Sequence, residues 1–255
     1  MSLILVTNDD GFQAPGLQQL FRAMQGIGRP VVIAPARDNS ASSHSLTMDR
    51  PLRVTVIDDS TYSIDGTPTD CVTIGIGKLL PARPVLVVSG INPGGNLGDD
   101  ISYSGTVSAA VEGTMVGVPS MAISLAGGPP FRFEAAAAVA ARVAGLILAR
   151  GLPPDTLLNV NVPNLEMAAI KGVRFTRQGR LKYEDAIKET LDPWGRRHYW
   201  IGGGIPSRDT GLDTDSRAIR EGYISITPIH LDLTNHEAVR RLTEEWHGLF
   251  EQTNS

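Results

Sequence analysis

The stretch "LILVTNDDGF" (residues 3–12) joins a short apolar run to two adjacent carboxylates. The unbroken apolar run predicts a strand that is buried on both faces, which is typical of a parallel sheet covered by helices. Asn8, Asp9, Asp10 and Gly11 are also ordinary turn residues, and a plain turn is an equally good interpretation of these four alone. Two neighbouring carboxylates at a buried strand end repel each other, however, and this repulsion favours a cation beside them.

The pattern that begins here continues through the first two thirds of the chain. Short apolar runs alternate with longer helix-like stretches, and this alternation predicts a Rossmann-like, doubly wound α/β domain with a mostly parallel sheet. The expected strands are residues 3–7, 30–35, 84–89, 119–124 and 157–163. The expected helices are residues 14–26, 69–80, 104–117 and 133–151.

The last third has a different composition. Residues 173–204 mix aromatic and charged side chains around a Pro-Trp-Gly turn, which predicts a long β-hairpin arm that a single subunit would leave uncovered. A strand is expected at 222–228, and Thr234 and Glu237 have the spacing of a capping box ahead of a final helix. We therefore expect a catalytic core at residues 1–165 and an extension at 166–255 whose arm and final helix serve oligomerisation.

Composition restricts the class of protein. The 255 residues carry a formal net charge of −4, which disfavours a nucleic acid polymer as partner. Cys71 is the single cysteine, so an internal disulfide is impossible. The N-terminus lacks a basic region ahead of its apolar run, and Arg142 interrupts the most apolar long segment, so neither a signal peptide nor a membrane span is expected. A cytoplasmic protein is the expectation.

Polar segments follow three of the expected strands. In an open α/β sheet, ligands bind outside the carboxyl ends of the strands. Residues 8–11, 36–45 and 90–106 follow such ends, and they are rich in oxygen-bearing side chains and glycine. Carboxylate, hydroxyl and amide oxygens favour hard cations such as Mg²⁺, Mn²⁺ or Ca²⁺. The sequence therefore predicts a divalent metal at Asp9 and Asp10.

The third of these segments, "GINPGGNLGDDISYSGT" (90–106), also suits a phosphate group. Its glycines allow a close backbone approach, and Asn92 and Asn96 supply amide groups. Ser104, Gly105 and Thr106 lead into a predicted helix, whose N-terminus attracts anions. An ordinary N-cap explains Ser104 or Thr106 alone, but a metal at the same edge of the sheet favours phosphate binding.

Several familiar motifs are absent. No G-x-S-x-G elbow precedes a serine, which argues against a Ser-His-Asp hydrolase. Residues 72–79 depart from the Walker A pattern at both ends, and "NDDGFQAPG" (8–16) is not a dinucleotide fingerprint. The carboxylates are adjacent rather than spaced as Asp-x-Asp, which disfavours an aspartyl-nucleophile phosphatase.

Four segments in order resemble the SurE family of survival-protein nucleotidases: "ILVTNDDG" (4–11), "GTPTDCV" (66–72), "VSGINPGGNLGDDISYSGTVSAAVEG" (88–113) and "GYISITPIHLDLT" (222–234). The resemblance implies a C-terminal extension exchanged between subunits in a homodimer or homotetramer. It implies one divalent cation, Mg²⁺ or Mn²⁺, per subunit. The implied metal ligands are Asp9, Asp10, Ser40 and Asn92, and the implied phosphate-binding residues are Asn96, Ser104, Gly105 and Thr106. Ser42 and Ser43 are close enough to replace Ser40, and Ala36 stands where the family usually has an acidic residue.

The implied activity is metal-assisted hydrolysis of nucleoside 5′- and 3′-monophosphates, with short-chain polyphosphate as a further candidate substrate. Asp9 and Asp10 are both eligible as the catalytic base, and a covalent aspartyl intermediate stays open. One alternative is a metal-dependent nucleotide-binding sensor without turnover. Another is a glycosyl-transferring enzyme, which would call for an Asp-x-Asp site and a second nucleotide domain. Both alternatives predict no release of phosphate from a nucleoside monophosphate.

Overall fold

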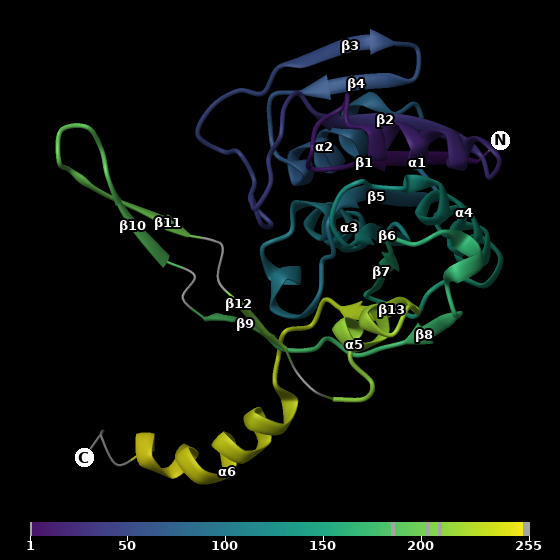
Figure 1. Cartoon of the computed structure of the whole chain (residues 1–255). Helices are drawn as coiled ribbons and strands as arrows, with labels where there is room; N and C mark the ends of the chain where they lie inside the picture. The colour runs from purple at the N-terminus through teal and green to yellow at the C-terminus, as the bar shows by residue number, and fades with distance from the viewer. Residues whose placement is uncertain (1, 185–186, 202–204, 209–210, 252–255) are drawn as a thin grey trace.

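A nine-stranded sheet forms the centre of the computed structural model, which describes residues 2–184, 187–201, 205–208 and 211–251 (Figure 1). Its strands are β1 (Leu3–Thr7), β2 (Arg29–Pro35), β3 (Val54–Asp58), β4 (Thr61–Ile64), β5 (Leu86–Pro93), β6 (Ser120–Ala126), β7 (Thr156–Pro163), β8 (Val173–Phe175) and β13 (Ile224–His230). The α-helices are α1 (Pro15–Gln25), α2 (Pro68–Ile74), α3 (Gly105–Met115), α4 (Phe133–Arg150), α5 (Asp215–Arg220) and α6 (His236–Glu251).

The strand order confirms the doubly wound, mostly parallel sheet. The order is β3-β4-β2-β1-β5-β6-β7-β13-β8. β1 lies between β2 and β5 and is parallel to both, with Val6 opposite Val32 on one side and Val88 on the other. β3 and β13 are the strands that run antiparallel to a neighbour, β3 to β4 and β13 to β7.

β1 explains why the sheet needs helices on both faces. All five of its residues are buried, as the unbroken apolar run predicted. Ile4 and Val6 belong to a core cluster with α1 and α4, whereas Leu3 and Leu5 belong to a second cluster with α2 and α3. Side chains alternate between the faces of a strand, so one helical layer would leave half of β1 exposed.

Two elements differ from the prediction in the first half of the chain. The hairpin of β3 and β4 was not predicted, because Asp58, Asp59 and Ser60 interrupt its β-branched residues. The predicted helix at 69–80 instead divides into α2 and a π-helical turn at Gly75–Leu79. Thr67 caps α2 with a complete capping box, in which its hydroxyl accepts from the Asp70 backbone and the Asp70 carboxylate accepts from the Thr67 backbone.

β5 continues four residues beyond the predicted end at Ser89 and carries an irregularity there. Its register with β6 shifts between Ser89 and Asn92. Gly90 has φ +136°, and a Cβ at this position would come 2.2 Å from the Ile123 carbonyl oxygen. The irregular segment therefore needs glycine, and beyond it Asn92 resumes the pairing of β5 with β6 opposite Ser124.

The hairpin arm is confirmed in the residues that the structure describes. β9 (Leu181–Glu184) pairs with β12 (Ile205–Arg208), and β10 (Ile187–Leu191) pairs with β11 (Arg197–Ile201). Figure 1 shows the arm pointing away from the sheet, and α6 also extends outward. Large side chains of the arm are exposed: Ile187, Leu191, Trp194, Tyr199, Trp200 and Ile201.

The predicted capping box of the last helix is wrong. α6 begins at His236, and the Asn235 side chain accepts a 2.9 Å hydrogen bond from the Ala238 backbone. The Thr234 backbone instead donates to Asp232 at 2.8 Å, so Thr234 belongs to the turn before the helix. Asn is as good an N-cap as Thr, and the register of the turn decided between them.

β8 and β13 belong to the central sheet although they come from the predicted extension. The division of the chain at residue 165 stays a prediction. Among the described residues, none of the helices has the length and hydropathy needed to cross a membrane.

Candidate active site

The three polar segments meet at the carboxyl ends of β1, β2 and β5. The chain moves from β1 to β2 on one side and places β5 on the other, so a topological switch point lies between β1 and β5. The Asn39 backbone donates to the Asp9 carbonyl at 2.8 Å, which joins the first two segments. The Ser43 hydroxyl donates to the Ser102 carbonyl at 2.9 Å, which joins the second and third.

Asp9 is the carboxylate fixed at the centre of this junction. It is only 5% exposed, and Thr106 donates a short hydrogen bond from its hydroxyl to Oδ1. Burial raises the pKa of Asp9, while the hydrogen bonds from Thr106 oppose that rise. Thr106 therefore orients Asp9 and stabilises its charged form.

Asp10 has fewer partners. Burial, followed by the charges of Asp9 and Asp38, raises the pKa of Asp10 to about 7. Its Oδ2 atom is buried without a hydrogen-bond partner in the described part of the chain. A carboxylate with an unpaired buried oxygen beside a second carboxylate is the arrangement that a cation relieves.

The serine-rich segment offers two hydroxyls of different character. Ser40 is exposed, and its hydroxyl donates to Asp38 Oδ1 at 2.6 Å. Ser42 is half-buried, and its Oγ is buried without a partner among the described residues. Ser40 donates its proton to Asp38 and keeps the lone pairs of its oxygen for a metal, whereas Ser42 lies against Gly105.

The two asparagines of the third segment have distinct roles. Asn92 donates from Nδ2 to the Gly94 carbonyl at 2.9 Å, which leaves its carbonyl oxygen for a ligand. Asn96 is buried and donates from Nδ2 to Ser124 Oγ at 2.8 Å. Its backbone is held by the side chains of Asn159 and Asn161. Asn92 is thus available at the site, whereas Asn96 anchors the segment.

The N-terminus of α3 lies directly against Asp9. A Cβ at Gly105 would come 2.8 Å from the Asp9 Cβ, 3.1 Å from its Oδ2 and 3.0 Å from the Ser42 Oγ. The Ser104 hydroxyl accepts from the Val107 backbone at 3.1 Å and caps the helix. A glycine at the first helical position therefore lets the helix N-terminus and the carboxylate pair share one small space.

These residues fit a hard divalent cation. The donors are two carboxylates supplemented by amide and hydroxyl oxygens, and this set suits Mg²⁺ or Mn²⁺. No group of three or more His, Cys, Asp or Glu side chains with metal-binding geometry occurs within the described ranges. The buried oxygens of Asp10 and Ser42, which have no partner in the described part of the chain, are the atoms that such a cation would satisfy.

His44 has an acidic partner that the sequence did not reveal. Its Nε2 lies 3.0 Å from Glu112 Oε2, and the Thr73 hydroxyl donates to Glu112 Oε1 at 2.9 Å. Glu112 is buried on α3, about two turns from Gly105. This network connects the serine-rich segment to α2 and α3. We therefore interpret His44 as a residue that holds the segment in place.

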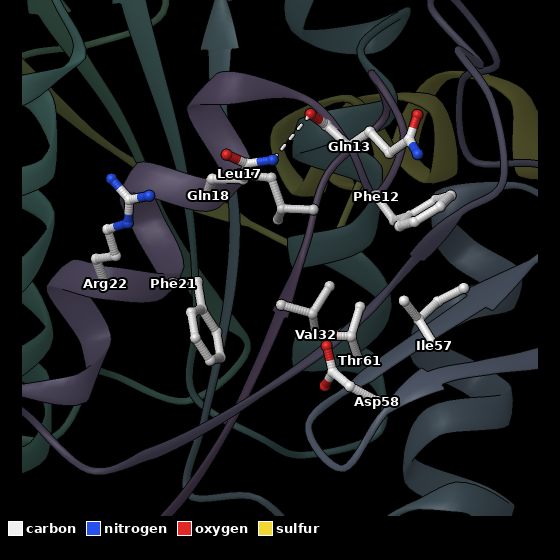
Figure 2. A pocket seen from close by; sticks show the side chains of 10 residues that line it. All are labelled: Phe12, Gln13, Leu17, Gln18, Phe21, Arg22, Val32, Ile57, Asp58 and Thr61. Carbon is white, nitrogen blue, oxygen red and sulfur yellow. Dashed lines mark hydrogen bonds between the residues drawn. The ribbon is translucent and has the colours of Figure 1, made fainter.

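A separate cleft lies beside α1. It has a volume of about 320 Å³, and Figure 2 shows that its lining comes from α1, the loop ahead of it, β2 and the β3–β4 hairpin. The lining mixes five apolar and five polar residues: Phe12, Gln13, Leu17, Gln18, Phe21, Arg22, Val32, Ile57, Asp58 and Thr61. Phe12 follows Asp10 by two residues, but the cleft contains none of the predicted site residues.

Comparisons with known proteins agree on one family. The sequence model of the family described as "Survival protein SurE" matches residues 4–185. A protein named 5′-nucleotidase SurE from Geobacter metallireducens is 52% identical over 94% of this chain and 95% of its own length. One from Pelobacter propionicus is 50% identical over 94% and 98%. The crystal structure of the SurE protein from Aquifex aeolicus superposes with a TM-score of 0.85, at 42% identity, over 95% of this chain and 98% of that one.

Proposed function

Because the chain belongs to the SurE family, we propose that it hydrolyses nucleoside 5′-monophosphates to nucleoside and phosphate at the Asp9–Asp10 site. The two relatives are named 5′-nucleotidases and align with nearly the whole chain, so the protein is a 5′-nucleotidase. A nucleotide sensor without turnover is the less favoured alternative. Nucleoside 3′-monophosphates and short-chain polyphosphate complete the proposed substrates, since both present a terminal phosphate.

One observation carries the assignment of the site. Asp10 has a buried oxygen without a partner among the described residues, next to a second carboxylate and within the same small space as the N-terminus of α3. A metal and a phosphate are the two ligands that such neighbours attract, the first through the carboxylates and the second through the helix N-terminus.

The proposed metal ligands are Asp9, Asp10, Ser40 and Asn92, with one Mg²⁺ or Mn²⁺ in each subunit. Ser42 supports a variant of this set, because its buried oxygen already faces the site. When bound, the cation neutralises charge on the phosphate and lowers the pKa of a coordinated water. Glycine at position 105 and the Thr106 hydrogen bond keep Asp9 in place for this role.

The remaining groups act on the phosphate and the attacking water. The Gly105 N–H at the start of α3 is the one assigned to the phosphate, because the Val107 N–H donates to the Ser104 hydroxyl and the Thr106 N–H donates to Asp9. Asn96 and the Ser104 cap keep the chain on either side of the binding position in a fixed path. Thr106 donates to Oδ1 of Asp9, whereas Oδ2 of Asp10 has no partner among the described residues, so we assign Asp10 as the group that accepts a proton from the attacking water.

The exposed apolar side chains of the arm support a homodimer or homotetramer, in which another copy of the chain covers them. The same reasoning supports a core at residues 1–165 with an extension at 166–255 as the oligomerising part. The cytoplasm is the proposed location, where nucleoside monophosphates and Mg²⁺ are available.

The first experiment is phosphate release from nucleoside 5′- and 3′-monophosphates with Mg²⁺, with Mn²⁺ and with EDTA. Turnover that EDTA abolishes and Mn²⁺ restores supports the metal-dependent reaction. An Asp10→Asn variant should lose at least about 100-fold in kcat, as expected when a general base that also binds the metal is removed. Absence of phosphate release from every substrate in the presence of either metal contradicts the proposed function.

A further inference from the structure

We propose that Asp215 and Gln178 are positioning residues for hydrolysis, which hold the site loop (residues 92–106) through Gly98 and tie it to the root of the arm. The proposal rests on the proposed function, because the site loop carries Asn92 and leads into Gly105 and Thr106. Neither Asp215 nor Gln178 belongs to the predicted site, and both are far from the loop in the sequence.

Both backbone polar groups of Gly98, its N–H and its carbonyl, are hydrogen-bonded to side chains. Its backbone N–H donates to Asp215 Oδ2 at 2.8 Å, and its carbonyl accepts from Gln178 Nε2 at 2.9 Å. Gly98 has φ +55°, and it begins the short 3-10 turn Gly98–Ser102 that leads to the Ser104 cap. These two hydrogen bonds therefore fix the middle of the site loop.

The other oxygen of Asp215 holds the root of the arm. Asp215 Oδ1 accepts from the Gly179 backbone at 3.1 Å and from the Ser216 backbone at 2.6 Å. A Cβ at Gly179 would lie 2.9 Å from Asp215 Oδ1, so the backbone there packs directly on the carboxylate. Gly179 precedes β9 by two residues. One side chain thus joins the site loop through one oxygen and the arm through the other.

The burial of a carboxylate at position 215 has to be explained, because burying a charge costs free energy. Asp215 is fully buried, and burial raises its pKa, while the N–H groups of Gly98, Ser216 and Gly179 oppose that rise. Three backbone donors offset much of the cost of burying the charge. An apolar side chain would avoid this cost but would leave the Gly98 and Gly179 N–H groups without a partner.

The site loop has two further anchors, and the Gly98 contact lies between them. Asn159 and Asn161 hold it at Asn96, and Ser43 holds it at Ser102. Loss of the middle anchor frees the 3-10 turn while both ends stay attached. The expected displacement is small, but a shift of about 1 Å at reacting groups can cost up to about 100-fold in rate.

The test compares Asp215→Asn and Gln178→Ala with the wild-type holoenzyme. The control is Asp213→Ala, which removes an exposed ion pair to Arg177 in the same turn without touching Gly98. The measurements are kcat and KM on a nucleoside 5′-monophosphate and on p-nitrophenyl phosphate, and the inhibition constant of inorganic phosphate. Circular dichroism and thermal unfolding establish a temperature at which each variant is folded.

We expect kcat/KM to fall about tenfold in Gln178→Ala and further in Asp215→Asn, by the same factor on both substrates, because the phosphate site is common to them. The inhibition constant of phosphate should rise in both variants, while Asp213→Ala stays within about twofold of wild type. If Asp215→Asn does not fold, Gln178→Ala decides the question.

Wild-type kinetic constants in Gln178→Ala, or a loss of activity with an unchanged inhibition constant for phosphate, would overturn the positioning role. A wild-type enzyme that releases no phosphate with either metal contradicts the proposed function instead, so the two failures are distinguishable.

Discussion

At the scale of single residues, the adjacency of Asp9 and Asp10 is the feature from which most of the site follows. The sequence predicts a cation at this pair, which stays a prediction, and burial together with the charge of Asp9 raises the pKa of Asp10 to about 7. Without a cation, this environment favours the neutral form of Asp10, whereas the proposed reaction needs its charged form.

Asp10→Asn should stabilise the metal-free protein at alkaline pH. The pKa of Asp10 is raised in the folded state, so its contribution to stability is present at low pH and is lost as the pH rises through about 7. The amide has no charge to bury. In EDTA at pH 8 we expect the variant to gain on the order of 1 kcal/mol, after discounting for solvent screening, which is about 2–4 °C in Tm.

The measurement is thermal unfolding in EDTA at pH 5 and pH 8, with Asp59→Asn as control because Asp59 is exposed in the turn between β3 and β4. Mn²⁺ should raise the Tm of the wild type and of the control but not that of Asp10→Asn. An equal Mn²⁺ stabilisation of all three proteins would be evidence against Asp10 as a ligand.

Gly105→Ala should remove most of the activity. The added methyl group would meet the Asp9 side chain at 2.8–3.1 Å, so either the carboxylate or the start of α3 has to move. We expect a loss of at least about tenfold in kcat/KM. Gly77→Ala is the matched control, because a Cβ there meets no atom within 4 Å. Near-wild-type kinetics of Gly105→Ala would show that the spacing between α3 and Asp9 is not critical.

Residue-level prediction from the sequence succeeded where the chemistry is local. Asp9 and Asp10 follow a buried strand, and their position at its end could be inferred from the pattern alone. Asn159, Asn161 and Asp215 could not be inferred, since they reach the site loop from 63 to 117 residues away in the sequence. Ser124 on β6, which binds Asn96, was also missed because its strand has the pattern of an ordinary buried one.

At the scale of elements, the prediction worked for strands buried on both faces. The predicted bounds of β1, β2, β6 and β7 agree with the structure to within one or two residues, because their short length and the turn residues beside them favour a buried strand over a helix. The β3–β4 hairpin was missed because it lies at the edge of the sheet, where polar residues are tolerated. The end of β5 was misplaced since its irregular segment resembles a loop in the sequence.

Gly145→Ala in α4 should stabilise the protein without changing its kinetics. A Cβ at Gly145 meets no atom within 4 Å, and the residue lies in the interior of an 18-residue helix. Alanine in a helix interior is favoured over glycine by about 1 kcal/mol. Denaturant unfolding should show a higher midpoint with unchanged slope. A lower midpoint would mean that α4 needs the glycine for packing.

At the scale of the whole molecule, the arm is the part of the chain whose exposed apolar side chains the proposed oligomer would cover. One face of the β10–β11 ribbon carries Ile187, Tyr199 and Ile201, all exposed, and Ile201 is 88% exposed. Ile201→Glu should shift the protein toward monomer in sedimentation velocity experiments, because a charge cannot be buried there without a partner. Gln25→Glu, at an exposed position at the end of α1, is the control that adds the same charge outside the arm. A wild-type protein that is monomeric at micromolar concentration contradicts the role of the arm.

For the chain as a whole, the sequence predicts the α/β fold class but not the complete strand order. Alternating apolar strands and helices predict a parallel sheet covered by helices, because parallel strands need crossover connections and buried strands need cover on both faces. The antiparallel pairing of β13 with β7 was not predictable, since it depends on where a strand from the extension finds a free edge.

The two edges of the nine-stranded sheet bear on how the protein behaves at high concentration. An exposed edge strand is a template on which another chain can add a strand, which is a route to aggregation. β3 forms one edge and exposes Val56 and Ile57, but its register breaks between Val56 and Asp58, and Asp58 and Asp59 follow at once. β8 forms the other edge and is only three residues long. Charge and irregularity at one border, and shortness at the other, protect this sheet from growing into a fibril.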